Sequence, residues 1–164
     1  EIYRCDWSSD VCSSDLWGMA GGQAIDLASV GHPLDEAQLR QMHRLKTGAL
    51  LQCSVQLGAA CGPRLSAPAL DALLRFGQAL GLAFQVVDDI LDVTADSATL
   101  GKTAGKDAAA NKPTYVALMG LQAAQRHADD LAEQAQQALA DTGLEAQALQ
   151  PLRGLAAMVV RRQH

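Results

Sequence analysis

Apolar residues recur at helical spacing through most of the chain, and short runs of glycine, proline and polar residues separate the helical stretches. The pattern predicts helices over residues 18–27, 35–61, 66–93, 113–140 and 146–161. Asp35 has the residue type and position expected of a helix N-cap, and Pro151 is expected to interrupt or restart the last helix. Since no alternating strand pattern is found, the sequence predicts an all-α fold.

The predicted helix over 66–93 is apolar on nearly every side and leaves only a narrow polar strip. That strip contains Gln78, Gly81, Gln85, Asp88, Asp89 and Asp92. A helix of this kind is typical of a buried element, where carboxylates are unfavourable unless they are paired or hold a cation. Oxygen ligands favour a hard ion, and Mg²⁺ that also binds a substrate phosphate fits best. The alternative is that the DDxxD spacing marks an ordinary solvated helix face.

The predicted helix over 35–61 carries a lysine close to its apolar stripe. The stripe consists of Leu39, Leu50, Cys53 and Leu57, and Lys46 is offset from it by about 20° at 100° per residue. An inward lysine is unfavourable unless it meets an anion, and the alternative is a side chain that reaches solvent. Thr47 and Gly48 follow, and a glycine inside a helix indicates close packing or a bend.

A loop over 96–111 follows the carboxylates. It contains two glycines and two lysines, Lys102 and Lys106, and Lys112 follows directly. Lysine supplies a point charge to phosphate oxygens, and glycine lets the backbone approach them, although many such loops are simply solvated. Carboxylates suited to Mg²⁺, an inward lysine and a basic loop together favour a diphosphate as ligand.

Composition narrows the function classes further. The chain of 164 residues suits a single domain, and its formal net charge of -5 makes a nucleic-acid partner unexpected. We find no secretory signal and no apolar run long enough to span a membrane, so no stable membrane insertion is predicted. The four cysteines show no metal-binding or disulfide spacing, and a cytoplasmic location is the default expectation.

Residues 1–16 differ from the rest of the chain. Cys5-Asp6-Trp7-Ser8-Ser9-Asp10 is nearly repeated by Cys12-Ser13-Ser14-Asp15, and no helical or strand period is present. We interpret 1–16 as a foreign or disordered segment, for example one from a cloning or sequencing junction. Residues 17–164 are then predicted to form the folded domain.

Several motifs in combination resemble those of the trans-isoprenyl diphosphate synthases. From Gly18 onward the chain is similar to the C-terminal half of that family, most of all to its bacterial farnesyl diphosphate synthases. The matching motifs are Gly21-Gly22-Gln23-Ala24-Ile25-Asp26 for GQxxD, His43-Arg44-Leu45-Lys46-Thr47-Gly48 for the KTG element, Phe84 to Asp92 for FQxxDDxxD, and Gly101-Lys102, Gly105, Asp107, Lys112 and Thr114 for the loop that follows.

The resemblance implies a partial isoprenoid-synthase helical bundle and a Mg²⁺-dependent condensation. In that reaction an allylic diphosphate ionises, and isopentenyl diphosphate attacks the carbocation. By similarity, the expected metal ligands are Asp88, Asp89 and Asp92, directly or through water. Lys46, Lys102 and Lys112 would bind diphosphate, Thr47 and Gln85 would lie beside the cation and leaving group, and Gln23 and Asp26 would support the site. The family also implies a homodimer when the protein is complete.

The sequence departs from the family in one large respect. The first aspartate-rich motif and the isopentenyl diphosphate contacts belong to the N-terminal half, which this chain does not contain, so we expect no condensation by the chain alone. A non-catalytic helical subunit of a full-length synthase is the main alternative. A terpene cyclase is disfavoured because Asp88-Asp89-Ile90-Leu91-Asp92 lacks the usual Asn and Ser/Thr ligands. A purely structural bundle would leave the inward Lys46 unexplained.

Overall fold

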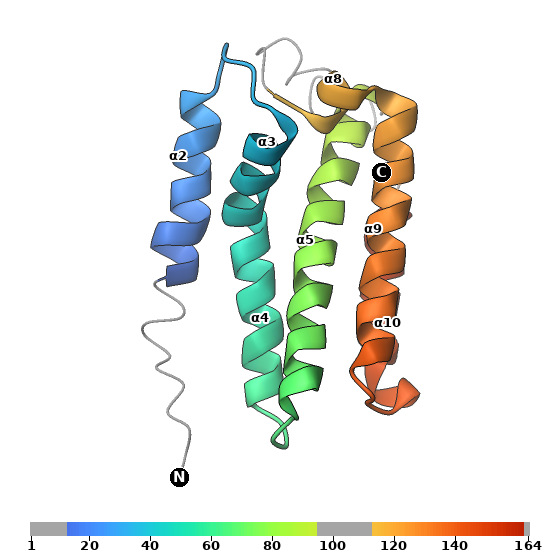
Figure 1. Cartoon of the computed structure of the whole chain (residues 1–164). Coiled ribbons are helices and arrows are strands. Elements are labelled where there is room, and N and C mark those ends of the chain that lie inside the picture. The colour runs from blue at the N-terminus through green and yellow to red at the C-terminus, as the bar shows by residue number, and fades with distance from the viewer. Residues whose placement is uncertain (1–12, 95–112, 163–164) are drawn as a thin grey trace.

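A computed structural model describes residues 13–94 and 113–162, and every regular element in those ranges is helical. The elements are η1 (Ser13–Ala20), α2 (Gly21–Ala28), α3 (Glu36–His43), η2 (Arg44–Gly48), α4 (Ala49–Ala60), α5 (Ala67–Thr94), α8 (Tyr115–Met119), α9 (Leu121–Asp141) and α10 (Ala146–Val160). Figure 1 shows α4, α5 and α9 side by side, with α2 beside α3 at one edge. The all-α prediction is confirmed.

Local signals fix the starts of two long helical runs. Asp35 Oδ1 accepts from the Gln38 backbone N–H at 2.8 Å, and the Asp35 N–H donates to Gln38 Oε1 at 3.0 Å. This capping box satisfies backbone donors that a helix start leaves without intrahelical partners. Ser66 plays the same part for α5, since its Oγ accepts from the Ala69 N–H at 3.3 Å. The predicted N-cap at Asp35 is therefore confirmed.

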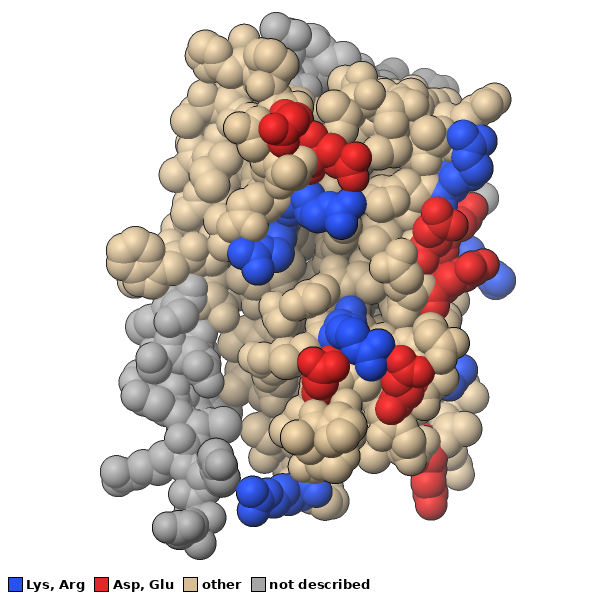
Figure 2. Space-filling view, in the orientation of Figure 1, with Lys and Arg blue, Asp and Glu red and all other residues tan. Residues whose placement is uncertain are grey.

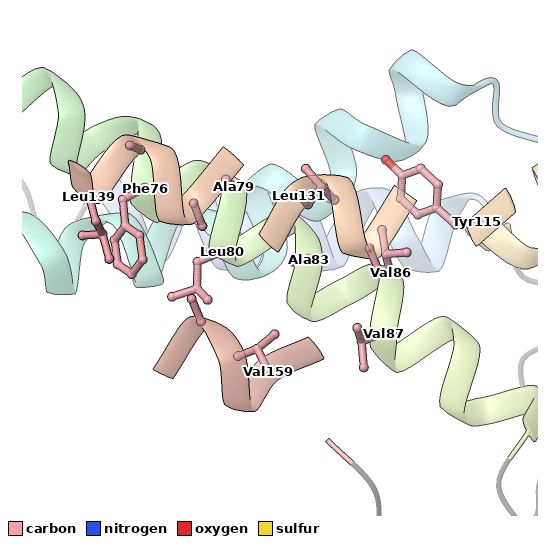
Figure 3. Packing of buried hydrophobic residues seen from close by; sticks show 14 of the residues in the cluster. Phe76, Ala79, Leu80, Ala83, Val86, Val87, Tyr115, Leu131, Leu139 and Val159 are labelled. Carbon is pink, nitrogen blue, oxygen red and sulfur yellow. The ribbon is translucent and has the colours of Figure 1, made fainter. Parts of the chain in front are cut away.

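The core forms around α5, which packs against α3, η2, α4, α8, α9 and α10. At 28 residues it is about 42 Å long, enough to run the length of the bundle. Figure 3 shows its side chains Phe76, Leu80 and Val86 among residues contributed by the other helices, such as Leu139 and Val159. The prediction that this helix is buried on most sides holds for most of its apolar residues, although Leu70 and Val93 near its two ends are exposed.

Because α5 is so long and apolar, it has the length and composition of a membrane-spanning helix. The expectation that no apolar run is long enough was therefore wrong. In this structure 61% of the most apolar window of α5 lies inside the bundle, because α4 and α9 cover it. Length and hydropathy alone do not distinguish such a core helix from a membrane span.

The predicted helix over 113–140 is in fact two helices. Gly120 has a φ of 82°, in the left-handed region, and separates α8 from α9. Thr114 caps the first of them, with its side chain accepting from the Ala117 N–H at 3.1 Å. The single-helix prediction was wrong because Gly120 was not recognised as a break, although glycine readily adopts this conformation. In contrast, α10 continues through Pro151 without interruption.

Two elements, η1 and η2, are π-helical, and this changes the predicted register. The run from α3 through η2 to α4 is continuous, as predicted for 35–61, but wider turns occupy Arg44–Gly48. A spacing of 100° per residue therefore fails across η2. Leu39 and Cys53 of the predicted apolar stripe are buried, whereas Leu50 is exposed. The first helical run also begins at Ser13, ahead of the predicted start at 18.

Gly22 allows α2 to lie directly against η2. A Cβ on Gly22 would overlap the backbone nitrogen of Lys46 and lie 2.6 Å from its Cα. Backbone atoms cannot rotate away as a side chain does, so a larger residue here must push the two elements apart. The GQxxD and KTG motifs are thus held together through their main chains.

We expect Gly22→Ala to lower the free energy of unfolding by about 1–3 kcal/mol, the range of an overpacked core. Gly58→Ala is the matched control, because a Cβ there meets nothing within 4 Å. That change should raise stability by up to about 1 kcal/mol through helix propensity. Urea unfolding of both variants measures the difference, and equal stability of the two would contradict the close approach.

Candidate active site

Lys46 of η2 and Asp26 of α2 form an ion pair. Lys46 Nζ lies 2.8 Å from Asp26 Oδ2, and the two side chains are 34% and 11% exposed. The inward lysine therefore has a partner inside the chain, and Lys46 does not in itself argue against a purely structural bundle. An amine that is partly withdrawn from water is stabilised by such a charge-assisted hydrogen bond. The pair also fixes the direction in which Lys46 leaves the π-helical turn.

Asp89 lies inside the bundle and accepts a backbone hydrogen bond. Its Oδ2 accepts from the Tyr115 N–H at 2.7 Å, and its side chain is 10% exposed. Tyr115 is the first residue of α8, so the carboxylate satisfies a donor at that helix start. A negative charge at a helix N-terminus is also electrostatically favourable. The carboxylate group of Asp89 therefore joins α5 to α8.

His43, at the end of α3, connects the same region of α5 to the KTG segment. Its Nδ1 lies 3.0 Å from Gln85 Oε1, and its Nε2 lies 4.0 Å from Asp89 Oδ2. The Tyr115 ring stacks on the imidazole with centroids 5.8 Å apart, and His127 approaches Tyr115 from the other side at 5.4 Å. Burial lowers the pKa of His43 from 6.5 to about 4, so the ring is neutral at pH 7.

Asp88 points away from this buried cluster. Its side chain is 62% exposed, and its Oδ1 accepts from Arg162 at 2.9 Å. The Arg162 guanidinium also lies over the Phe84 ring, 4.5 Å from its centroid, in a cation–π contact. The last described residue of the chain is thereby held against the second aspartate-rich motif. Adjacent aspartates thus have different environments, one solvated and one buried.

The other predicted site residues are only partly brought together. Thr47 is half-buried on η2, Asp92 is half-buried one turn beyond Asp88, and Gln23 is exposed on α2. Lys102, Lys106 and Lys112 lie outside the described residues, as does the loop over 96–111. Within 13–94 and 113–162, no group of three or more acidic, histidine or cysteine side chains converges as a metal cage.

The donor set nevertheless suits Mg²⁺. This ion usually keeps several waters and binds through one or two carboxylates together with substrate phosphates, so a closed cage is not required. Asp88 and Asp92 are four residues apart and lie on one face of α5, with only oxygen donors to offer. Asp89 fits less well as a direct ligand because its Oδ2 accepts from the Tyr115 N–H.

A groove of about 450 Å³ lies elsewhere in the described part of the chain. It is lined by residues of α3, η2, α4, α5 and α9, including Arg40, Arg44 and Arg75. Gly48 of the KTG motif also lines it, but none of the predicted site residues within the described ranges does. Arg40 pairs with Glu36, and Arg75 pairs with Asp71 and Asp141, so much of the positive charge is balanced. Figure 2 shows the same interspersion of acidic and basic side chains over this face of the molecule.

Sequence reasoning gave no role to two residues of the site region, His43 and Tyr115. His43 directly precedes the π-helical turn, and Tyr115 follows the basic loop. A buried histidine three positions before Lys46 has no periodic signal of its own, because its partners are 42 and 46 residues away. The pairing of Arg162 with Asp88 was not predicted either, since the two residues are 74 positions apart.

Comparison with known proteins decides the family. The polyprenyl synthetase family matches residues 8–151 of this sequence. The chain belongs to the polyprenyl synthetase family. The match begins within the segment over 1–16, whose foreign or disordered character remains a prediction.

Individual relatives of this chain are farnesyl diphosphate synthases and related enzymes. The chain is 51% identical over 137 residues to a probable farnesyl diphosphate synthase of Sinorhizobium fredii, covering 80% of this chain and 41% of the relative. It is 44% identical over 153 residues to the farnesyl diphosphate synthase of Escherichia coli, covering 91% and 51%. The chain thus spans about half the length of the curated relatives it matches.

A solved structure extends the comparison to the fold. The geranyltransferase of Helicobacter pylori, crystallised with magnesium and isoprenyl diphosphate, superposes with a TM-score of 0.66 at 33% identity. The match covers 88% of this chain and 45% of that one. The helices described above therefore correspond to part of a larger helical enzyme fold.

Substitution of Asp26 tests how much the Lys46–Asp26 ion pair contributes to stability. We expect Asp26→Asn to destabilise the chain by about 1–3 kcal/mol, because it weakens a hydrogen bond between charged, partly buried groups. Glu36→Gln makes the same chemical change in the exposed pair with Arg40 and should alter stability by less than about 1 kcal/mol. Chemical denaturation of both variants measures this, and a smaller effect at Asp26 than at Glu36 would contradict it.

The buried His43 predicts an acid-sensitive fold. Below pH about 6.5 the unfolded chain takes up a proton at this residue, which the folded chain does not accept until about pH 4. Stability should therefore fall by about 3 kcal/mol as the pH drops through this window, since each pKa unit corresponds to about 1.4 kcal/mol. Unfolding curves measured from pH 8 to 4 test this.

Two variants separate the contribution of His43 to this pH dependence of stability from that of other groups. His43→Asn removes the titrating ring and should flatten the pH dependence between 6.5 and 4. His32→Gln, at an exposed position, should leave the slope unchanged. A steep slope retained in His43→Asn would assign the effect to other groups.

Proposed function

We propose that this chain is part of a Mg²⁺-dependent prenyltransferase that condenses an allylic diphosphate, dimethylallyl or geranyl, with isopentenyl diphosphate. The product would be farnesyl diphosphate or a related short-chain prenyl diphosphate. One observation carries most weight: the KTG turn and the FQxxDDxxD helix pack together through His43 and Gln85, within 3.0 Å. His43 and Gln85 are 42 residues apart in the sequence, so their contact brings the two motifs next to each other in the fold.

In this proposal each group has a separate task. Lys46, held by Asp26, supplies a fixed positive charge for the leaving diphosphate, which acquires negative charge as the allylic bond breaks. Lys102 and Lys112 add charge to the same group. Asp88 and Asp92, with Asp89 behind them, would hold Mg²⁺, which neutralises phosphate charge and orients the leaving group. Thr47 and Gln85 provide polar contacts beside the reacting carbon.

The chain covers about half of its relatives, so the complete activity is proposed only together with an N-terminal half. The exposure of large apolar side chains, which a soluble bundle normally covers, supports the need for an N-terminal half. Trp17 of η1 is 82% exposed and Leu27 of α2 is 66% exposed, both near the N-terminal edge of the bundle. We propose that an N-terminal half packs over them and that the complete enzyme forms a homodimer.

The proposed function is tested by joining residues 17–164 to the N-terminal half of the Sinorhizobium fredii relative. We expect the joined protein to make a prenyl diphosphate from radiolabelled isopentenyl diphosphate, and the isolated chain to make none. Asp88→Asn in the joined protein should lower kcat/KM by about 10²–10³-fold, as for loss of one electrostatic contact to a transition state.

Asp129→Asn on the exposed face of α9 is the matched control and should leave kcat/KM unchanged. An unaffected Asp88→Asn enzyme would remove Asp88 from the metal site. A joined protein that folds, binds no diphosphate and transfers no prenyl group would instead favour the alternative of a non-catalytic subunit.

A further inference from the structure

A continuous series of contacts links the start of α8 to Gln85. The Tyr115 N–H donates to Asp89 Oδ2 at 2.7 Å, and the same oxygen lies 4.0 Å from His43 Nε2. The opposite ring nitrogen, Nδ1, lies 3.0 Å from Gln85 Oε1. The Tyr115 ring stacks on the imidazole face, so the ring is held by its edge and its face. Side chains from α3, α5 and α8 therefore determine how this histidine is placed.

The contact between His43 and Gln85 specifies where the ring proton is. An amide oxygen only accepts hydrogen bonds, so Nδ1 must be the donor. A neutral imidazole carries a single N–H, and Nε2 is then an acceptor that has no hydrogen-bond partner among the described residues. The negative charge of Asp89 favours the opposite tautomer, but a separation of 4.0 Å is too long for a hydrogen bond, whereas 3.0 Å is optimal.

The tautomer in turn determines which end of the Gln85 amide is available. If Oε1 is bound to His43, the NH₂ group is left for other partners. An NH₂ group donates to anions, whereas an amide oxygen would accept from donors or lie beside a cation. The two orientations thus suit different ligands, and His43 selects between them.

We propose that His43 is a positioning residue that binds Gln85 Oε1 and so presents the Gln85 NH₂ group to an oxygen of a bound diphosphate. This inference rests on the proposed function, because it assigns a partner to Gln85 within the same site. It gives Gln85 of the FQ pair a specific role as a hydrogen-bond donor to an anion. It also gives Asp89 a role in orienting His43 through the stacked Tyr115.

The first test is the tautomer of His43 in the unmodified chain. Long-range ¹H–¹⁵N correlation spectra at pH 7 distinguish Nδ1–H from Nε2–H imidazole, and loss of the signal in His43→Asn assigns it among the four histidines. We expect the Nδ1–H form. A predominantly Nε2–H ring would overturn the inference, because Gln85 would then have to turn its oxygen outward.

The second test separates positioning from packing. In His43→Asn the side-chain amide nitrogen takes the place of Nδ1 and can still donate to Gln85, whereas His43→Leu fills the space without a donor. We expect the Gln85 side-chain amide to remain rigid by ¹⁵N relaxation in the unmodified chain and in His43→Asn, and to become mobile in His43→Leu. Equal rigidity in all three would overturn the inference.

The third test adds Mg²⁺ and inorganic diphosphate to the same labelled samples. We expect the Gln85 NH₂ resonances to shift in the unmodified chain and in His43→Asn, and to lose that shift in His43→Leu. If diphosphate perturbs Lys46 but leaves the Gln85 NH₂ unchanged, the inference fails and the proposed diphosphate site stands. If diphosphate perturbs neither residue, the proposed site fails and the inference fails with it.

Discussion

The arrangement of this region depends on a single carboxylate buried in the bundle. An unpaired carboxylate would be strongly unfavourable inside a protein, and Asp89 meets this constraint with a backbone N–H at the start of α8. That bond places Tyr115, whose ring then supports His43, and His43 in turn meets Gln85. The start of α8, the end of α3 and the inward strip of α5 thus meet around one buried carboxylate.

The two neighbouring aspartates have different environments, which the sequence pattern did not distinguish. Asp88 and Asp89 are adjacent, and the pattern of apolar positions assigned both to one narrow polar strip. In the fold, 100° of helix rotation is enough to send Asp88 to solvent, where it meets Arg162, and Asp89 to the interior. Those environments depend on residues far along the chain, which no local period encodes.

The features that the sequence predicted correctly depend on residues that lie close together in the chain. The N-cap at Asp35 and the burial of α5 each depend on residues within a few turns, and both predictions are confirmed. Gly120 also carried a local signal, which was overlooked. The partner of Lys46 lies 20 residues upstream, and a π-helical turn separates the two halves of its apolar stripe. Most of the features that hydrophobic periodicity did not predict therefore arise from tertiary pairing and from altered helical pitch.

The burial of α5 by a later helix also affects how the protein is made. Its main cover, α9, is translated after α5 and after the intervening residues. At about 5–20 residues per second, α5 leaves the ribosome several seconds before α9 is complete. During that interval a helix with the length and hydropathy of a membrane span has only part of its cover. Until α9 has been made, the apolar residues of α5 that α9 covers lack their partner in the bundle.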